Sequence, residues 1–168
     1  MIADIKYGEW SGRNRALKAL GEIKDESAVE PLIEFLKEVK HPDAIIALGE
    51  LKEPRAISLL IEFLGFPYTR AAAASALVQF GTIATEPLIE ALKNIDSSIC
   101  KAAIETLGRL KDPKAIDPLV DLLGTGFFDD LVISALGNIG SPSIKSLVKA
   151  LRAGNWNAKD KADSTLST

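Results

Sequence analysis

The residues of this chain that could carry chemistry are charged side chains that recur at a regular spacing. One set recurs about every 29 residues and consists of Glu34, Glu62, Glu90, Asp121 and Lys149. A second set stands four residues earlier and consists of Glu30, Ser58, Glu86, Asp117 and Lys145. Residues four apart share one face of a helix. The two sets therefore predict a surface that is acidic along most of its length and basic at its end, which suits a partner of basic character.

Residues that could support catalysis are scarce. His41 is the only histidine, and because Pro42 follows it at the start of a short helical segment, we expect a loop or helix-capping role. Cys100 is the only cysteine, which rules out an intrachain disulfide and a cysteine-rich metal site. We expect it to be an ordinary, partly buried side chain. We therefore predict no catalytic residues, no bound metal, no cofactor, and a protein that is not an enzyme.

Composition and charge narrow the kinds of partner and location. The chain has 168 residues, of which 47% are hydrophobic and 6% aromatic, which suits one domain with an aliphatic core. Its net charge of −3 gives no sign of the basic surface of a nucleic-acid-binding protein. Asp4, Lys6 and Glu9 interrupt the apolar run that a signal peptide would need, and no stretch reaches membrane-spanning length. We expect a cytoplasmic protein with neither a nucleic acid nor a membrane as its partner.

The elements that position the charged side chains form an internal repeat. The pattern ALKALGEIKDESAVEPLIEFLK of residues 16–37 returns four times along the chain. The aligned reference leucines are Leu20, Leu48, Leu77, Leu107 and Leu136. Each copy reads as two antiparallel helices joined by a short polar turn, and a period near 29 residues is typical of a solenoid. We expect Leu77 and Leu107, in the middle of the stack, to be fully buried.

Small residues and prolines also recur once per unit. A small residue precedes most of the reference leucines, and we expect it to let neighbouring helices pack closely. A glycine follows most of these leucines, and we expect it to serve either helix packing or a turn. Pro31, Pro87 and Pro118 lie early in the second helices, and we expect them to bend these helices or to delay their regular start.

We therefore predict an all-α fold, a right-handed α-α superhelix (α-solenoid) of about five helix pairs in a single domain spanning residues 1–168. The expected units are residues 11–38, 42–65, 67–94, 97–124 and 127–152. Residues 1–7 match the end of a second helix and residues 156–166 match a first helix, so both are expected to be terminal half-units. The polar last segment is typical of a terminal cap. We expect a monomer, with head-to-tail association of the half-units as the alternative.

The repeat pattern A-L-G-x-[IL]-x-D-x-x-A-[IV]-x-P-L-[IV] resembles the HEAT-like repeat of the phycobilisome-lyase type over almost the whole chain. The resemblance implies that the second helices line the concave side of the array. It also implies an alternative function, a subunit of a phycobilin-lyase-like enzyme that assists chromophore attachment. HEAT-like deoxyhypusine hydroxylase is excluded because the chain has no His-Glu pair, and the charge pattern argues against a DNA glycosylase of helical-repeat type.

The function that we favour is a non-enzymatic protein-protein interaction scaffold, which binds a protein or peptide along the concave face of the second helices. The residues expected to contact the partner are Glu30, Glu34, Glu62, Glu86, Glu90, Asp117, Asp121, Lys145 and Lys149. The alternative is an ordinary solvated surface, because like charges ~10 Å apart in water repel by only ~0.4 kcal/mol. Phe127 and Phe128 are a further candidate patch, since adjacent residues point in different directions and one should be exposed.

Overall fold

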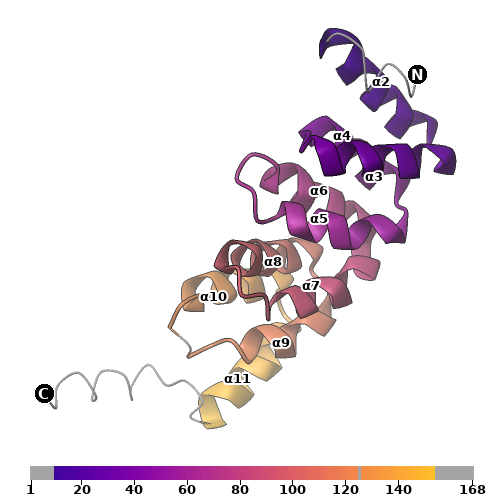
Figure 1. The fold of residues 1–168 in the computed structure, drawn as a ribbon. Coiled ribbons are helices and arrows are strands. Elements are labelled where there is room, and N and C mark those ends of the chain that lie inside the picture. Colours follow the sequence, from indigo (N-terminus) through magenta and orange to yellow (C-terminus); the bar gives the residue numbers. More distant parts are fainter. Residues whose placement is uncertain (1–9, 125, 154–168) are drawn as a thin grey trace, which may run out of the picture.

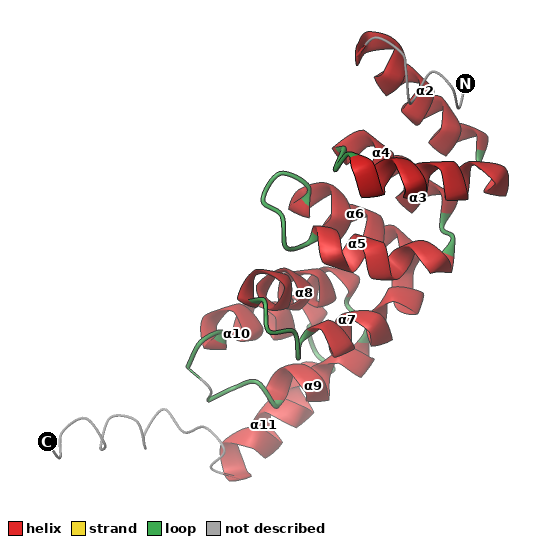
Figure 2. Ribbon diagram, in the orientation of Figure 1, coloured by secondary structure: helices red, strands yellow, loops and turns green. Residues whose placement is uncertain are grey.

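Helix pairs stack one after another into an elongated array in the computed structural model, which describes residues 10–124 and 126–153 (Figure 1). The first helices of the pairs are α2 (Trp10–Ile23), α4 (Pro42–Leu51), α6 (Arg70–Phe80), α8 (Ser97–Leu110) and α10 (Asp129–Ile139). The second helices are α3 (Val29–Glu38), α5 (Ile57–Phe63), α7 (Thr85–Ala91), α9 (Ile116–Val120) and α11 (Ser143–Ala153). The described chain is helix and loop throughout (Figure 2). The predicted all-α solenoid is confirmed, while the half-units predicted at residues 1–7 and 156–166 lie outside the described residues.

Short 3-10 helices open four of the second helices. They are η1 (Glu26–Ala28), η2 (Pro54–Ala56), η3 (Gly81–Ala84) and η4 (Pro113–Ala115). Pro31 lies in the first turn of α3, where a missing N–H costs no intrahelical hydrogen bond. Leu59 takes the proline position in α5, yet η2 precedes that helix as well. The recurring proline is therefore compatible with the 3-10 start but is not its cause.

The core consists of aliphatic side chains between the two layers of helices. Leu77 and Leu107 are fully buried, as predicted. Neighbouring first helices approach closely where the repeat glycine meets an alanine of the next repeat. A Cβ atom added to Gly49 would lie 2.6 Å from Cβ and 2.8 Å from Cα of Ala76. The equivalent distances to Cα are 3.0 Å from Gly21 to Ala47 and 2.8 Å from Gly108 to Ala135. The glycine and alanine at these two repeat positions thus set the spacing between neighbouring first helices.

The junction between the third and fourth repeats is built differently. Here Val78 takes the glycine position and Thr106 the alanine position. Thr106 is fully buried, and its hydroxyl donates to the Ala102 carbonyl within its own helix at 2.6 Å. The Thr85 hydroxyl donates to Oδ2 of Asp112 across the junction, a buried hydrogen bond of 2.7 Å. The hydrogen bond between Thr85 and Asp112 therefore links the two repeats at the junction that lacks the close glycine-alanine contact.

The side chain at one repeat position near the start of the first helices forms a hydrogen bond with the preceding inter-repeat loop. In α6 the Arg70 guanidinium donates through Nε to the Leu64 carbonyl at 2.9 Å. In α8 the Cys100 thiol, at the same repeat position, donates to the Leu92 carbonyl at 3.3 Å. In α10 the Asp129 carboxylate accepts the Gly124 N–H at 3.1 Å. Three different side chains thus anchor the end of the preceding repeat.

Candidate partner-binding surface

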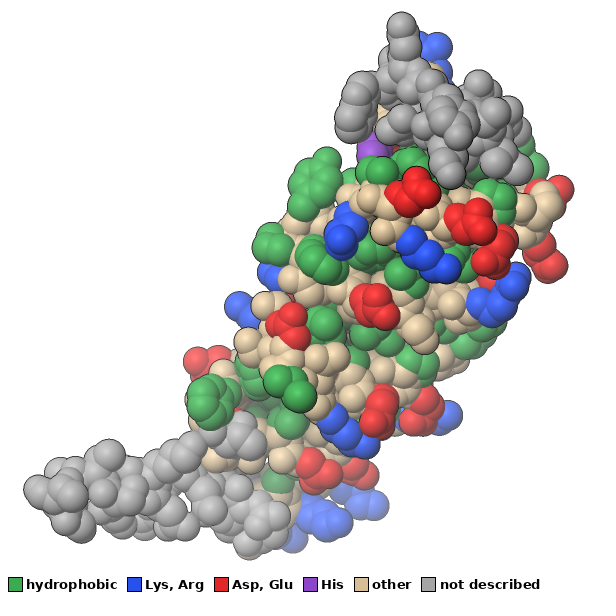
Figure 3. Space-filling view, in the orientation of Figure 1, with side chains coloured by type: hydrophobic (Ala, Val, Ile, Leu, Met, Phe, Trp, Pro, Cys, Tyr) green, Lys and Arg blue, Asp and Glu red, His purple; other side chains and the backbone are tan. Residues whose placement is uncertain are grey.

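The second helices carry the charged residues that the sequence predicts to face a partner. All nine are exposed: Glu30, Glu34, Glu62, Glu86, Glu90, Asp117, Asp121, Lys145 and Lys149. They lie on α3, α5, α7 and α11, on α9, and at the residue that caps the end of α9. Seen from outside, carboxylates on this side of the molecule are separated by Lys, Arg and hydrophobic side chains (Figure 3). The surface is therefore a series of acidic patches and not a continuous acidic strip.

Three of these carboxylates already have a partner within the chain. Oε2 of Glu30 lies 3.8 Å from Nη1 of Arg55, which belongs to the next repeat. Oδ1 of Asp117 accepts a hydrogen bond of 2.8 Å from the Ser146 hydroxyl on α11. The Glu90 carboxylate lies 2.8 Å from Nζ of Lys93. The first two contacts link neighbouring repeats, so part of the acidic pattern has a role inside the stack.

Other carboxylates of the surface are not compensated. Within residues 10–124 and 126–153, no ion pair forms at Glu34, Glu62 or Asp121. All three hold the same repeat position: Glu34 lies on α3, Glu62 on α5 and Asp121 directly after α9. A partner that brings cations to them displaces no ion pair of the described residues.

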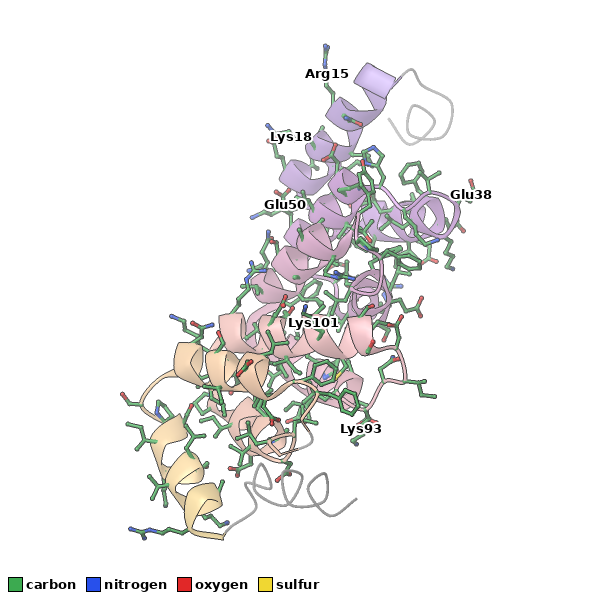
Figure 4. All side chains as sticks on the ribbon, turned by 90° about the vertical axis from the view of Figure 1, so that its left-hand side faces the viewer. Arg15, Lys18, Glu38, Glu50, Lys93 and Lys101 are labelled. Atoms are coloured by element: carbon green, nitrogen blue, oxygen red, sulfur yellow. The ribbon has the colours of Figure 1, made fainter. Side chains whose placement is uncertain are left out.

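The second helices turn progressively around the long axis of the array. In Figure 4, α3 lies on the right, where Glu38 marks its end, whereas α11 lies at the lower left. Lys145, Lys149 and Arg152 are all on α11. The basic end of the surface has thus rotated away from its acidic beginning, and a partner that contacts both has to follow the twist.

His41 and Cys100 occupy structural positions. His41 caps α4, with its Nδ1 accepting the N–H of Asp43 at 3.3 Å, in agreement with the predicted capping role. Cys100 is 4% exposed, and burial raises the pKa of its thiol. A raised pKa reduces the thiolate fraction, so this cysteine is a poor nucleophile. In the described part of the chain, no group of three or more His, Cys, Asp or Glu side chains could hold a metal ion.

Two of the hollows on the surface of the described residues lie against the first helices. One, of about 360 Å³, lies between α2 and α4 and is lined by Asn14, Arg15, Lys18, Asp43, Ile46, Ala47 and Glu50. Figure 4 shows Arg15, Lys18 and Glu50 on the side opposite Glu38. The other, of about 730 Å³, includes Phe127 and Phe128. Phe127 is 85% exposed and Phe128 packs against the core, as adjacency predicts. Sequence reasoning missed the first hollow because its walls come from two repeats.

None of the described helices is both long and apolar enough to cross a membrane.

Comparison with known proteins identifies the family. A family model described as HEAT repeats matches residues 5–77 and again residues 64–132. The chain is also similar to the phycocyanobilin lyase subunit beta of Nostoc sp., with 31% identity over 75 residues. That similarity covers 45% of this chain and 38% of the relative, so the chain spans well under half of the relative's length. The repeat model covers most of the chain and confirms the predicted resemblance: the chain belongs to the family of HEAT-repeat proteins.

Proposed function

We propose that this chain is a non-enzymatic scaffold that binds a basic protein segment along the exposed side of its second helices. The observation that carries the proposal is the repeated, uncompensated carboxylate at Glu34, Glu62 and Asp121. Helical repeat arrays present extended surfaces of this kind to their partners. A cytoplasmic location, a monomeric state and a single domain over residues 1–168 are parts of the same proposal.

The charges contribute mainly to the rate and the selectivity of binding. An exposed ion pair contributes only about 0.2–1 kcal/mol, so three or four such pairs do not by themselves give a long-lived complex. Several carboxylates on one side of the molecule do attract a basic segment and speed its association, in a way that salt weakens. The lifetime of the complex then depends on a few buried anchor residues of the partner.

A charge-reversal experiment tests the proposal. The surface variant combines Glu34→Lys with Glu62→Lys, because neither residue forms an ion pair with another described residue and folding should be unaffected. The control variant combines Glu22→Lys with Glu105→Lys, which make the same change of charge at exposed positions on the first helices α2 and α8. Glu22→Lys also removes an exposed ion pair of 3.8 Å with Lys18, which contributes little to stability. Each variant and the wild type are used for quantitative affinity capture from extracts of the source organism.

The expected result is a set of basic proteins that the wild type and the control variant retain and the surface variant loses. Their recovery should fall as salt is raised, since the proposed attraction is screened within a Debye length of about 8–10 Å. Recovery of the same proteins in equal amounts with both variants would show that the acidic side chains are an ordinary solvated surface.

The second candidate is a subunit of a phycobilin-lyase-like enzyme, which assists chromophore attachment. Its support is the 31% identity over 75 residues with a phycocyanobilin lyase subunit beta. The test is to mix the purified chain with phycocyanobilin and to measure visible absorbance in the protein fraction after gel filtration. Co-eluting absorbance, or faster chromophore attachment to a phycobiliprotein when the chain is added, favours this function. Neither effect is expected of a scaffold without a chromophore site.

A further inference from the structure

The outer side of the last described helix pair, α10 and α11, exposes apolar side chains that earlier repeats bury. Ile133 is 45% exposed and Ile144 is 61% exposed. Their repeat equivalents are buried, namely Leu17, Ile45 and Ile104 for the first position and Val29, Ile57 and Ile116 for the second. Val148, one turn after Ile144 on α11, is 39% exposed. We call Ile133, Gly137, Ile144 and Val148 the end face.

The glycine of the end face identifies what this surface is shaped to hold. At three earlier junctions the repeat glycine contacts an alanine of the next first helix, in the pairs Gly21 with Ala47, Gly49 with Ala76 and Gly108 with Ala135. Gly137 holds the same repeat position, and a Cβ atom added to it would meet no described atom within 4 Å. The end face therefore has the same shape as the surfaces on which earlier repeats pack the first helix of the following repeat.

We propose that residues 157–166 of the same chain form a helix that packs on the end face. Residues 156–166 align with residues 10–20, which belong to the first helix α2. The segment thus has the sequence register of a first helix.

The register places a suitable residue opposite Gly137. Thr165 falls in the column of Ala47, Ala76 and Ala135, the residues that contact the earlier glycines. A threonine occupies this column once more within the array, at Thr106, where it is fully buried. Packing on the end face removes apolar surface from water, which favours the docked state. The docked helix is stabilised chiefly by covering Ile133, Ile144 and Val148.

The opposite side of the segment is suited to water. Asp163 takes the position that Leu17, Ile45 and Ile104 hold in other repeats. A carboxylate at a position that a following repeat would bury stops the stacking, because a buried unpaired charge is costly. The segment covers the end face without offering a new one, as a terminal cap of a repeat array does.

Disulfide trapping in the full-length chain tests the proposal. The test pair is Gly137→Cys with Thr165→Cys, and the control pair is Gly137→Cys with Asp163→Cys. At the equivalent junctions a Cβ atom added to the glycine lies 2.6–3.3 Å from the alanine Cβ, so a small separation of the helices brings the test pair, and not the control pair, to the Cβ···Cβ distance of about 3.5–4.5 Å that a disulfide requires. We therefore expect the intrachain bond of the test pair to form about tenfold faster under mild oxidation. Non-reducing electrophoresis and mass spectrometry identify the bond, and Cys100, which is buried, stays in place.

Two results would overturn the proposal. Equal rates for the two pairs would mean that the segment does not pack in the repeat register, and disulfide-linked dimers of the test pair would mean that a second copy covers the end face. A thermal melt of Gly137→Ala gives an independent measurement on the full chain. A docked helix predicts that the added methyl group lowers Tm, whereas an uncovered helix predicts an unchanged or higher Tm, because alanine favours helix over glycine.

Discussion

Gly49→Ala should destabilise the array even though it improves the intrinsic helix propensity of α4. The new Cβ atom would lie 2.6 Å from Cβ and 2.8 Å from Cα of Ala76, whereas nonbonded carbon atoms prefer about 3.5–4.0 Å. Helices α4 and α6 would have to separate locally by roughly 1 Å, and overpacking of this kind costs about 1–3 kcal/mol. The gain in helix propensity offsets about 1 kcal/mol of that cost. We expect a net loss of stability of about 1 kcal/mol.

The measurement is urea unfolding followed by far-UV circular dichroism, with a thermal melt in parallel. For a chain of this size, 1 kcal/mol corresponds to about 2–4 °C in Tm. Gly12→Ala is the matched control, because Gly12 is exposed on α2 and a Cβ atom there meets no described atom within 4 Å. This control should leave stability unchanged or raise it. If Gly49→Ala proves as stable as Gly12→Ala, the close helix approach does not constrain this position and the packing argument is wrong.

Two further predictions concern the fourth repeat. Leu107→Ala should lower the free energy of unfolding by ~2–5 kcal/mol because Leu107 is fully buried; urea unfolding of this variant beside Leu110→Ala, at a half-buried position, should show the smaller loss at Leu110. The Lys114 N–H and the Thr85 hydroxyl hold the pKa of Asp112 below its ordinary value of 3.8. The ionised Asp112 carboxylate therefore stabilises the folded chain. This stabilisation is fully present above pH 3.8 and is lost as pH falls through the lower pKa of the folded state. Asp112→Asn should therefore flatten the decline in urea midpoint between about pH 5 and pH 2, and an unchanged decline would contradict this account.

The repeat and its helices follow from local patterns in the sequence. Helical spacing of apolar residues depends only on neighbours a few positions away, and five copies of one pattern place the buried leucines in the same column. For that reason the burial of Leu77 and Leu107 could be predicted. The recurring proline of the second helices shows the limit of prediction from local patterns. Leu59 replaces this proline in α5, and a 3-10 helix still precedes α5. The backbone entry into the second helix depends on the turn as a whole and not on one residue.

Whether a carboxylate of the charged surface is available to a partner depends on its contacts with the neighbouring repeat. The recurrence of similar residues along the sequence does not reveal these contacts. Glu30 and Glu34 are alike in type and exposure, yet Glu30 has Arg55 of the next repeat at 3.8 Å and Glu34 forms no ion pair with a described residue. Arg70 and Cys100 differ completely in chemistry and still donate to equivalent carbonyls of the preceding loop. Side-chain hydrogen bonds between repeats join residues 27, 29 and 34 positions apart, and the twist of the array decides which residues meet. Periodicity along the chain carries no measure of that twist, so only the packed structure separates the carboxylates that hold repeats together from those open to a partner.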